Sequence, residues 1–236
     1  MSYIAILETG VPPNGLDEAH GSYADMFIEG LAGPGRQFRV FKTLEGELPP
    51  EGAPLDGVVI TGSPAGVYED DPWISDLIEW LKALDPSVPV AGICFGHQIM
   101  AQAWGGHVEK SDKGWGVGLH DYQVCDLNTW QALTGKDEAQ IRVAVSHQDQ
   151  VVKKPETAEV LATSDFTPNA ALRYTDRKAI SFQCHPEFSA AYARDLWEGR
   201  RHKIGDKLID QAVESLEKDS TRDSMLTAIS RFLEGK

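Results

Sequence analysis

Cys94 stands in a segment whose residue types favour nucleophilic chemistry. The apolar run Val88–Ile93 ends at this cysteine and a helical pattern follows, with Gly92 and Gly96 two residues to either side. This spacing is the cysteine counterpart of the G-x-S-x-G nucleophile elbow, a sharp strand-to-helix turn at which larger neighbours would collide with the backbone. A thiol at a helix N-terminus is favoured as the thiolate. The alternative is a buried cysteine that only fills space.

A thiolate nucleophile needs a proton partner, and His185-Pro186-Glu187 offers one at the end of the predicted strand Ala179–Cys184. Side chains two apart in extended backbone point to the same side, and Pro186 biases the residue before it away from helix. Glu187 can therefore hold the imidazole of His185 while the second ring nitrogen faces the thiol. This predicts a Cys-His-Glu triad. Because the tripeptide is common, a surface ion pair in a turn is the alternative.

Two backbone positions could stabilise a developing oxyanion. The N–H of Phe95, at the start of the predicted helix, has no intrahelical partner. Gly62, in Thr61-Gly62-Ser63-Pro64, follows the predicted strand Gly57–Thr61. Open α/β sheets place their sites at the carboxyl ends of strands, so these groups would meet at one edge. An ordinary strand-to-loop turn explains the Gly62 segment equally well.

The elements that must position these residues alternate between short apolar strands and helical patterns. This alternation is typical of an α/β fold with an open, mostly parallel sheet flanked by helices. The predicted strands are Tyr3–Leu7, Phe38–Phe41, Gly57–Thr61, Val88–Ile93, Leu172–Thr175 and Ala179–Cys184. Helices are expected from Pro72, capped by Asp70 or Asp71, and over Phe95–Trp104. Residues 108–172 mix strand and turn signals.

The tail after Glu187 is charged and helical in pattern. Ser220 and Asp223 have the spacing of a capping box before a last apolar stripe. No repeat or linker divides the chain, so we expect one domain over residues 1–236, with 189–236 as a C-terminal helical extension. The extension either packs onto this domain or covers the pocket or docks to another subunit.

Composition narrows the class of protein. The net charge of −14 provides no basic face for nucleic acid and disfavours an anionic membrane surface. No stretch approaches the roughly 20 apolar residues that span a bilayer. The N-terminal residues 1–7 predict a strand rather than a signal peptide. The three cysteines lack the spacing of a disulfide framework, which favours reduced thiols and a cytoplasmic protein. They are Cys94, Cys125 and Cys184.

Three segments, in this order, resemble the class I (triad-type) glutamine amidotransferases, especially the glutaminase part of GMP synthase and its stand-alone relatives. They are Gly92-Ile-Cys-Phe-Gly-His-Gln98, Ser146-His-Gln-Asp149 and His185-Pro-Glu187. The resemblance covers about residues 3–190 and implies a flavodoxin-like architecture. It implies a nucleophile at Cys94, a base at His185 and an orienting acid at Glu187. It also implies oxyanion donors at Gly62 and Phe95, and substrate-binding residues at Gln98, Ser146, His147, Gln148 and Asp149.

The reaction that the resemblance implies is hydrolysis of glutamine or another γ-glutamyl compound. Ammonia or an amine leaves as a γ-glutamyl thioester forms on Cys94, without metal or cofactor. Gln148 departs from the glycine of many relatives, which could change the rim of the pocket. We find no Ser-Gly-Gly-x-Asp-Ser loop, so we expect no ATP-pyrophosphatase domain on this polypeptide.

Three functions remain open. The first is a glutaminase that supplies ammonia to a separate synthase subunit. The second is a self-contained γ-glutamyl peptidase. The third, from a different class, is a non-catalytic binding or regulatory module of the same fold.

Other sites compete less well for these residues. Cys94, His97, His147 and His185 could be imagined around a zinc ion, but the elbow explains Cys94 better. The glycine-rich segment 114–118 does not open a helix after a strand, so it favours a turn near the pocket over a dinucleotide site. Cys184 alternates to the opposite strand face from His185, which predicts a core residue.

Overall fold

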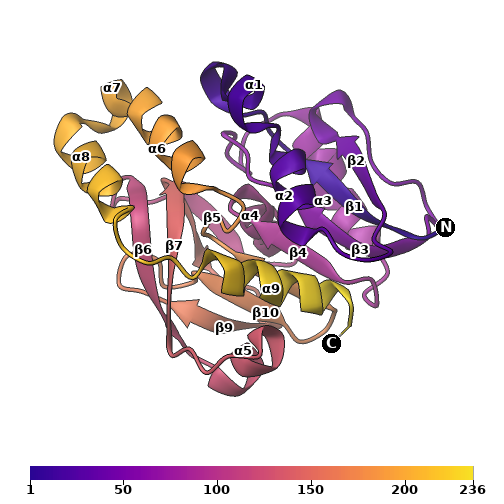
Figure 1. Ribbon diagram of the computed structural model, residues 1–236. Coiled ribbons are helices and arrows are strands. Elements are labelled where there is room, and N and C mark those ends of the chain that lie inside the picture. Colours follow the sequence, from indigo (N-terminus) through magenta and orange to yellow (C-terminus); the bar gives the residue numbers. More distant parts are fainter. Residues whose placement is uncertain (236) are drawn as a thin grey trace.

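The computed structural model describes residues 1–235, whose main feature is a nine-stranded sheet (Figure 1). From one edge to the other its strands are β2 (Phe38–Lys42), β1 (Tyr3–Glu8), β3 (Leu55–Ile60), β4 (Val90–Ile93), β11 (Ala179–Phe182), β10 (Ala171–Tyr174), β9 (Ala158–Thr163), β6 (Gly116–Val124) and β7 (Gln140–His147). Each antiparallel pairing in this sheet involves β6 or β10, so its other strands all run in one direction. The predicted mostly parallel α/β sheet is confirmed.

The strand directions explain where a site can form. β3, β4 and β11 are consecutive parallel neighbours, so their carboxyl ends meet at one edge. β7 runs the same way and ends at that edge too. A small second sheet, β5 (His107–Lys110) with β8 (Asp149–Lys153), adjoins the end of β7. The segments predicted to act together therefore all arrive at the same edge.

Helices cover both faces of the sheet because its buried strands are apolar on both sides. Along β1, Ile4 and Ile6 join one core while Ala5 and Leu7 join the other. The first face packs against α2 (Tyr23–Leu31), α5 (Leu127–Thr134) and α9 (Arg222–Leu233). The second face packs against α3 (Pro72–Ala83) and α4 (Phe95–Ala103).

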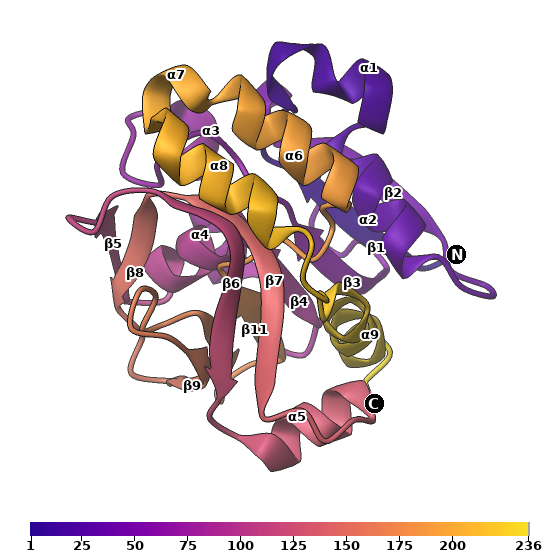
Figure 2. The same ribbon diagram turned by 60° about the vertical axis from the view of Figure 1, so that its left-hand side comes forward.

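The remaining helices gather at the carboxyl end of β7. They are α6 (Ala190–Gly199), α7 (Arg201–Ile204) and α8 (Asp206–Ser215). The short α1 (Leu16–His20) and the 3-10 turn Pro13–Gly15 lie beside them. A second 3-10 turn, Thr43–Glu45, follows β2. Figure 2 shows α6–α8 above β6 and β7, with α5 at the other end of these strands. The hydroxyl of Ser215 accepts a hydrogen bond from the Leu119 N–H at 2.8 Å, which ties α8 to β6. Within residues 1–235, no helix combines the length and apolarity needed to cross a membrane.

Two capping predictions need correction. α9 begins at Arg222 with Thr221 at its N-cap and without a side-chain cap, so the predicted Ser220–Asp223 capping box is wrong. The Ser220 hydroxyl instead donates to the Arg142 carbonyl on β7. Asp71 occupies the N-cap of α3 as predicted, but its side chain makes no capping hydrogen bond. At Ser220 the bond to a neighbouring strand replaces the cap that the local spacing predicted.

Candidate active site

Cys94 lies on a sharp turn between β4 and α4. Its backbone has φ 53° and ψ −101°, a sparsely populated combination for a residue with a side chain. A Cβ on Gly96 would lie 2.3 Å from the carbonyl oxygen of Ile60, and a Cβ on Gly92 would lie 2.6 Å from the carbonyl carbon of Gly96. Only glycine fits at either place. The predicted elbow geometry is therefore present.

The cysteine side chain lies at the wall of a pocket of about 320 Å³. Cys94 is 5% exposed, and its backbone N–H is held by the carbonyl of Phe182 at 2.8 Å. That bond comes from β11, the strand that leads to His185. The turn is thus fixed from its neighbour strand as well as by its own glycines.

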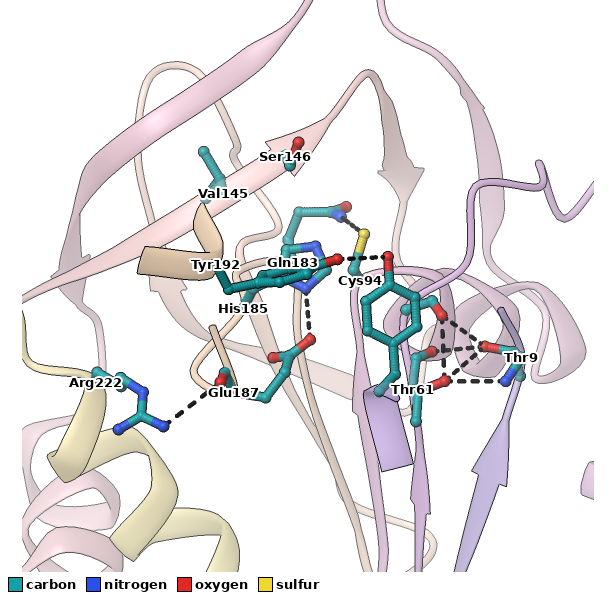
Figure 3. A network of polar contacts seen from close by, with 12 residues as sticks. Thr9, Thr61, Cys94, Val145, Ser146, Gln183, His185, Glu187, Tyr192 and Arg222 are labelled. Atoms are coloured by element: carbon teal, nitrogen blue, oxygen red, sulfur yellow. Dashed lines mark hydrogen bonds and ion pairs between the residues drawn. The ribbon is translucent and has the colours of Figure 1, made fainter. Parts of the chain in front are cut away.

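His185 and Glu187 form a buried pair beside the cysteine (Figure 3). His185 Nδ1 lies 2.7 Å from Glu187 Oε1, and the imidazole stacks on Phe188 with ring centroids 4.0 Å apart. The other carboxylate oxygen has no hydrogen-bond partner within residues 1–235. One carboxylate oxygen thus orients the ring, which leaves Nε2 available to the sulfur.

The charges of this group favour a protonated imidazole. Burial lowers the pKa of His185, but the Glu187 carboxylate and the Cys94 sulfur raise it more, from 6.5 to about 10. A cationic ring next to a sulfur stabilises a thiolate. A protonated His185 therefore forms an ion pair with the Glu187 carboxylate beside the Cys94 sulfur.

Gly62 and Phe95 both adjoin the cysteine. A Cβ on Gly62 would lie 2.9 Å from His185 Cε1 and 3.7 Å from Cys94 Cβ, so a larger residue here would press on the imidazole. Phe95 is the first residue of α4. Gly96, the next residue, donates its N–H to the Thr61 carbonyl at 3.1 Å and is not free for a ligand. This leaves the N–H groups of Gly62 and Phe95 as the candidates for an oxyanion hole.

Gln98 lies deep in the pocket and is held in place by two bonds. Its amide nitrogen donates to the Asp149 carbonyl at 2.9 Å and to Gln183 Oε1 at 3.2 Å. Gln183 in turn directs its amide nitrogen at the Cys94 sulfur, 3.6 Å away (Figure 3). The Asp149 carboxylate accepts from the Tyr68 hydroxyl at 3.0 Å. Burial raises the pKa of Asp149.

The segment predicted to bind substrate runs from the end of β7 into β8, and all four of its residues line the pocket. The Ser146 hydroxyl accepts a hydrogen bond from Arg200 Nη1 at 2.6 Å. His147 Nδ1 lies 3.1 Å from the Asp149 carbonyl, and burial lowers the pKa of this imidazole to about 3, so it is neutral. Gln148 is half-buried at the rim, and its carbonyl accepts from the Ser111 N–H.

The other candidate groups have structural partners. His97 is fully buried, lies 2.8 Å from the Ser181 hydroxyl, and burial lowers its pKa to about 3. Cys184 is buried in the core with Tyr122 and Val143, as its strand alternation predicts. No group of three or more His, Cys, Asp or Glu side chains in residues 1–235 is arranged to hold a metal ion.

Sequence reasoning missed several residues of the pocket. Gln183 precedes His185 by two residues on the same strand face, and this alternation could have revealed it. Arg200 and Lys203 line the pocket from the end of α6 and from α7, in a helical segment that carries no motif of its own. Tyr68 and Trp115 complete the rim from loops. Trp115 belongs to the glycine-rich segment 114–118, for which the sequence predicts a turn near the pocket. The other three carried no signal in the sequence, because only the fold brings them to the pocket.

The fold and site together define an α/β protein with a cysteine, histidine and glutamate gathered at the carboxyl ends of parallel strands. The family model described as glutamine amidotransferase class-I matches residues 18–195, and the chain belongs to this family. A glutamine amidotransferase-like protein of Schizosaccharomyces pombe is 30% identical over 98% of both chains. Gamma-glutamyl peptidase 2 of Arabidopsis thaliana is 28% identical over 93% of this chain and 90% of its own.

Two further comparisons agree. One GMP synthase subunit of Halobacterium salinarum is 33% identical over 59% of this chain and 70% of its own. The crystal structure of a glutamine amidotransferase from Thermotoga maritima superimposes with a TM-score of 0.77 and 21% identity, covering 99% of this chain and 98% of that one. At that identity, the structural similarity shows the shared fold alone.

Proposed function

We propose that the protein hydrolyses the γ-amide bond of glutamine or of a γ-glutamyl compound, with Cys94 as nucleophile. The observation that carries this proposal is the buried group of Cys94, His185 and Glu187 beside a 320 Å³ pocket. The comparisons support the hydrolase class, since relatives that span nearly the whole chain include γ-glutamyl peptidases.

In the first half of the proposed reaction, the Cys94 sulfur attacks the γ-carbonyl carbon. The carbonyl oxygen becomes an oxyanion facing the N–H groups of Gly62 and Phe95. Loss of one such donor typically costs about 3 kcal/mol of transition-state stabilisation. The C–N bond then breaks as His185 gives its proton to the leaving nitrogen, and a γ-glutamyl thioester remains on the sulfur.

In the second half of the reaction, a water molecule takes the place of the released amine, on the same side of the thioester. His185, now neutral, takes a proton from this water, whose oxygen attacks the thioester carbon. The C–S bond breaks, and glutamate leaves while the thiolate–imidazolium pair is restored. Glu187 keeps the ring in place in both steps and accepts no proton.

Trapping the intermediate tests this proposal. The purified chain is mixed with L-glutamine or γ-glutamyl dipeptides and quenched in acid, and peptide mass spectrometry then locates the modified cysteine. We expect a γ-glutamyl adduct on Cys94, absent from Cys125 and Cys184. Ammonia and amine release are measured in parallel. A folded protein that forms no adduct and releases no product from any donor would instead be a binding module.

A second function is supported by the similarity to the GMP synthase subunit of Halobacterium salinarum, whose name describes one part of a glutamine-hydrolysing synthase. In that case the protein would supply ammonia to a synthase partner. Glutaminase activity of the isolated chain would then be low and would rise on addition of cell extract. Rapid cleavage of γ-glutamyl dipeptides by the chain alone favours the self-contained hydrolase.

A further inference from the structure

The rim of the pocket carries positive charge, although the chain has a net charge of −14. Lys110, Arg200 and Lys203 line it. Its acidic lining residues are Glu69 and Asp149, whose carboxylates are already bonded to the Gly66 N–H and to the Tyr68 hydroxyl. Cations gathered at a concave site in an acidic protein attract an anionic ligand group.

Arg200 is the cation best placed to bind such a group. It lies half-buried between the Ser146 hydroxyl, 2.6 Å from Nη1, and the Trp115 ring, whose centroid is 5.6 Å from the guanidinium carbon. It forms no ion pair within the described residues. A guanidinium has five N–H donors, so most of them are left for a ligand. Held by a hydroxyl and an aromatic face, the group is also oriented in advance.

The next residue in the chain gives a direct contrast. Arg201 is bonded to three carboxylates, those of Glu198, Asp206 and Asp210. Arg200 lies between the same helices, but no acidic residue among residues 1–235 forms an ion pair with it. The two consecutive arginines therefore have different roles. Arg201 joins α6, α7 and α8 together, whereas Arg200 turns its charge toward the pocket.

The position of Arg200 relative to His185 and Cys94 indicates which end of the substrate it faces. Besides the main pocket, Arg200 lines a narrow crevice that also includes Tyr23, Cys94 and His185. The leaving nitrogen takes its proton from His185, so the leaving group must lie on the imidazole side of the sulfur. Free glutamine releases ammonia, which carries no carboxylate. An amino acid or peptide leaving from the same place does carry one.

We propose that Arg200, assisted by Lys203, binds the carboxylate of the leaving amino acid or peptide, which makes γ-glutamyl peptides with a free carboxylate the preferred substrates over glutamine. This inference rests on the proposed hydrolysis at Cys94. An arginine can hold a carboxylate through two parallel hydrogen bonds, whereas Lys203, which is exposed on α7, adds a point charge. The helices after the triad would thus set specificity without touching the reacting atoms.

Paired substrates test this proposal. γ-Glutamylglycine and γ-glutamylglycinamide differ only in the leaving group's carboxylate, and L-glutamine lacks the leaving amino acid altogether. For the wild type we expect kcat/KM to favour γ-glutamylglycine over the glycinamide by about 10- to 100-fold, the range of a charge-assisted hydrogen bond. Arg200→Ala should remove most of this preference, chiefly through KM, because it lowers kcat/KM for γ-glutamylglycine far more than for the other two substrates.

Matched variants separate recognition from folding. Arg200→Lys should restore part of the preference, and Lys203→Ala should reduce it less than Arg200→Ala does. Arg194→Ala, at an exposed position of α6, and Lys207→Ala, on the neighbouring helix α8, should leave it unchanged. An equal loss on all three substrates would overturn the proposal, because Arg200 would then bind the glutamyl part or serve the fold. A wild type indifferent to the carboxylate would overturn it too.

Binding measurements test recognition of the carboxylate independently of catalysis. Calorimetry with a Cys94→Ala variant compares the dissociation constants of γ-glutamylglycine and γ-glutamylglycinamide, with and without Arg200→Ala. Arg200-dependent preference for the acid supports the carboxylate site even if the wild type turns nothing over, and in that case only the hydrolysis proposal fails. Equal affinities, unaffected by Arg200→Ala, reject the site whatever the turnover.

Discussion

The ends of β4 and β11 make an instructive pair. The two strands are parallel neighbours, and each leads within two residues into a buried cysteine, Cys94 at 5% exposure and Cys184 at 2%. Cys94 has a positive φ and lines the pocket. Cys184 packs in the apolar core, and burial raises the pKa of its thiol. Both cysteines are thus buried. Cys94 differs in its backbone turn and in lying beside the His185–Glu187 pair, and these two features suit it to chemistry.

The largest expected difference between the two strand ends is in turnover. Cys94→Ala should lower kcat for γ-glutamyl substrates by about 10⁴-fold or more, since the nucleophile is lost. Cys184→Ala should stay within about threefold of wild type, because that sulfur packs in the core. Steady-state amine release measures both. A Cys94→Ala protein that retained substantial turnover would break the comparison.

The second largest expected effect on turnover concerns Glu187, the carboxylate that follows β11. Glu187→Gln should lower kcat by about 10³-fold, because the imidazole loses the partner that holds its tautomer and its charge. The pKa of His185 should fall, so the alkaline limb of the pH–rate profile should move to lower pH. Glu198→Gln, on the exposed side of α6, is the control. An unshifted limb would mean that another group protonates the leaving amine.

The same pair makes stability depend on pH. The pKa of His185 is raised on folding, from 6.5 to about 10, so its stabilisation is complete below pH 6.5 and is lost as pH rises toward 10. The free energy of unfolding of wild type should therefore exceed that of Glu187→Gln by more at pH 6 than at pH 10. Urea titrations at the two pH values measure this difference. A constant difference would contradict the assigned ion pair.

The elbow itself should be sensitive to one methyl group. Gly96→Ala places a carbon 2.3 Å from the Ile60 carbonyl oxygen, and we expect it to cost about 1–3 kcal/mol of stability and most of the activity. Gly33→Ala is the matched control, because the atoms nearest its new methyl belong to the flexible Arg36 side chain, at 3.5 Å. Thermal unfolding compares the two variants. Equal melting temperatures would mean that β3 can move away from α4.

The smallest effect separates strain from burial. A glycine adopts a positive φ without cost, so Cys94→Gly relieves backbone strain while it removes a side chain. Cys184→Gly only loses packing. We expect Cys94→Gly to be less destabilising than Cys184→Gly by about 1 kcal/mol or more. Denaturant unfolding at neutral pH measures the difference. If Cys94→Gly were the more destabilised variant, the turn at Cys94 would not be strained.

Much of the candidate site could be predicted because its parts are short-range in sequence. The elbow lies within five residues, Gly92 to Gly96, and its geometry follows from local steric limits. His185 and Glu187 are two residues apart in extended backbone, which places both side chains on one side. The strands and α3–α4 follow from hydrophobic periodicity, which needs only a few turns or pleats of chain. Their ends shifted by one or two residues, as at Val90 and Phe182.

The wrong capping prediction and the unpredicted pocket residues depend instead on contacts between distant segments of the chain. The capping box at Ser220 was wrong because that hydroxyl bonds to β7, a partner almost 80 residues away. Gln183 escaped notice because its role depends on Gln98, which reaches it from the neighbouring helix. Arg200 and Lys203 belong to an ordinary charged helical pattern, and nothing in that pattern says which cation faces a pocket.

The sequence by itself determined the chemistry available to this protein: a cysteine on an obligatory glycine turn, a histidine with its carboxylate, and a sheet to carry them. Only the tertiary structure decided which strands are neighbours, and therefore which of the groups at that edge contact one another. It also decided that α6 and α7 bring cations to the pocket rim. The reason is physical. Backbone geometry and periodicity are set within a few residues, whereas the packing that joins distant segments depends on the whole core.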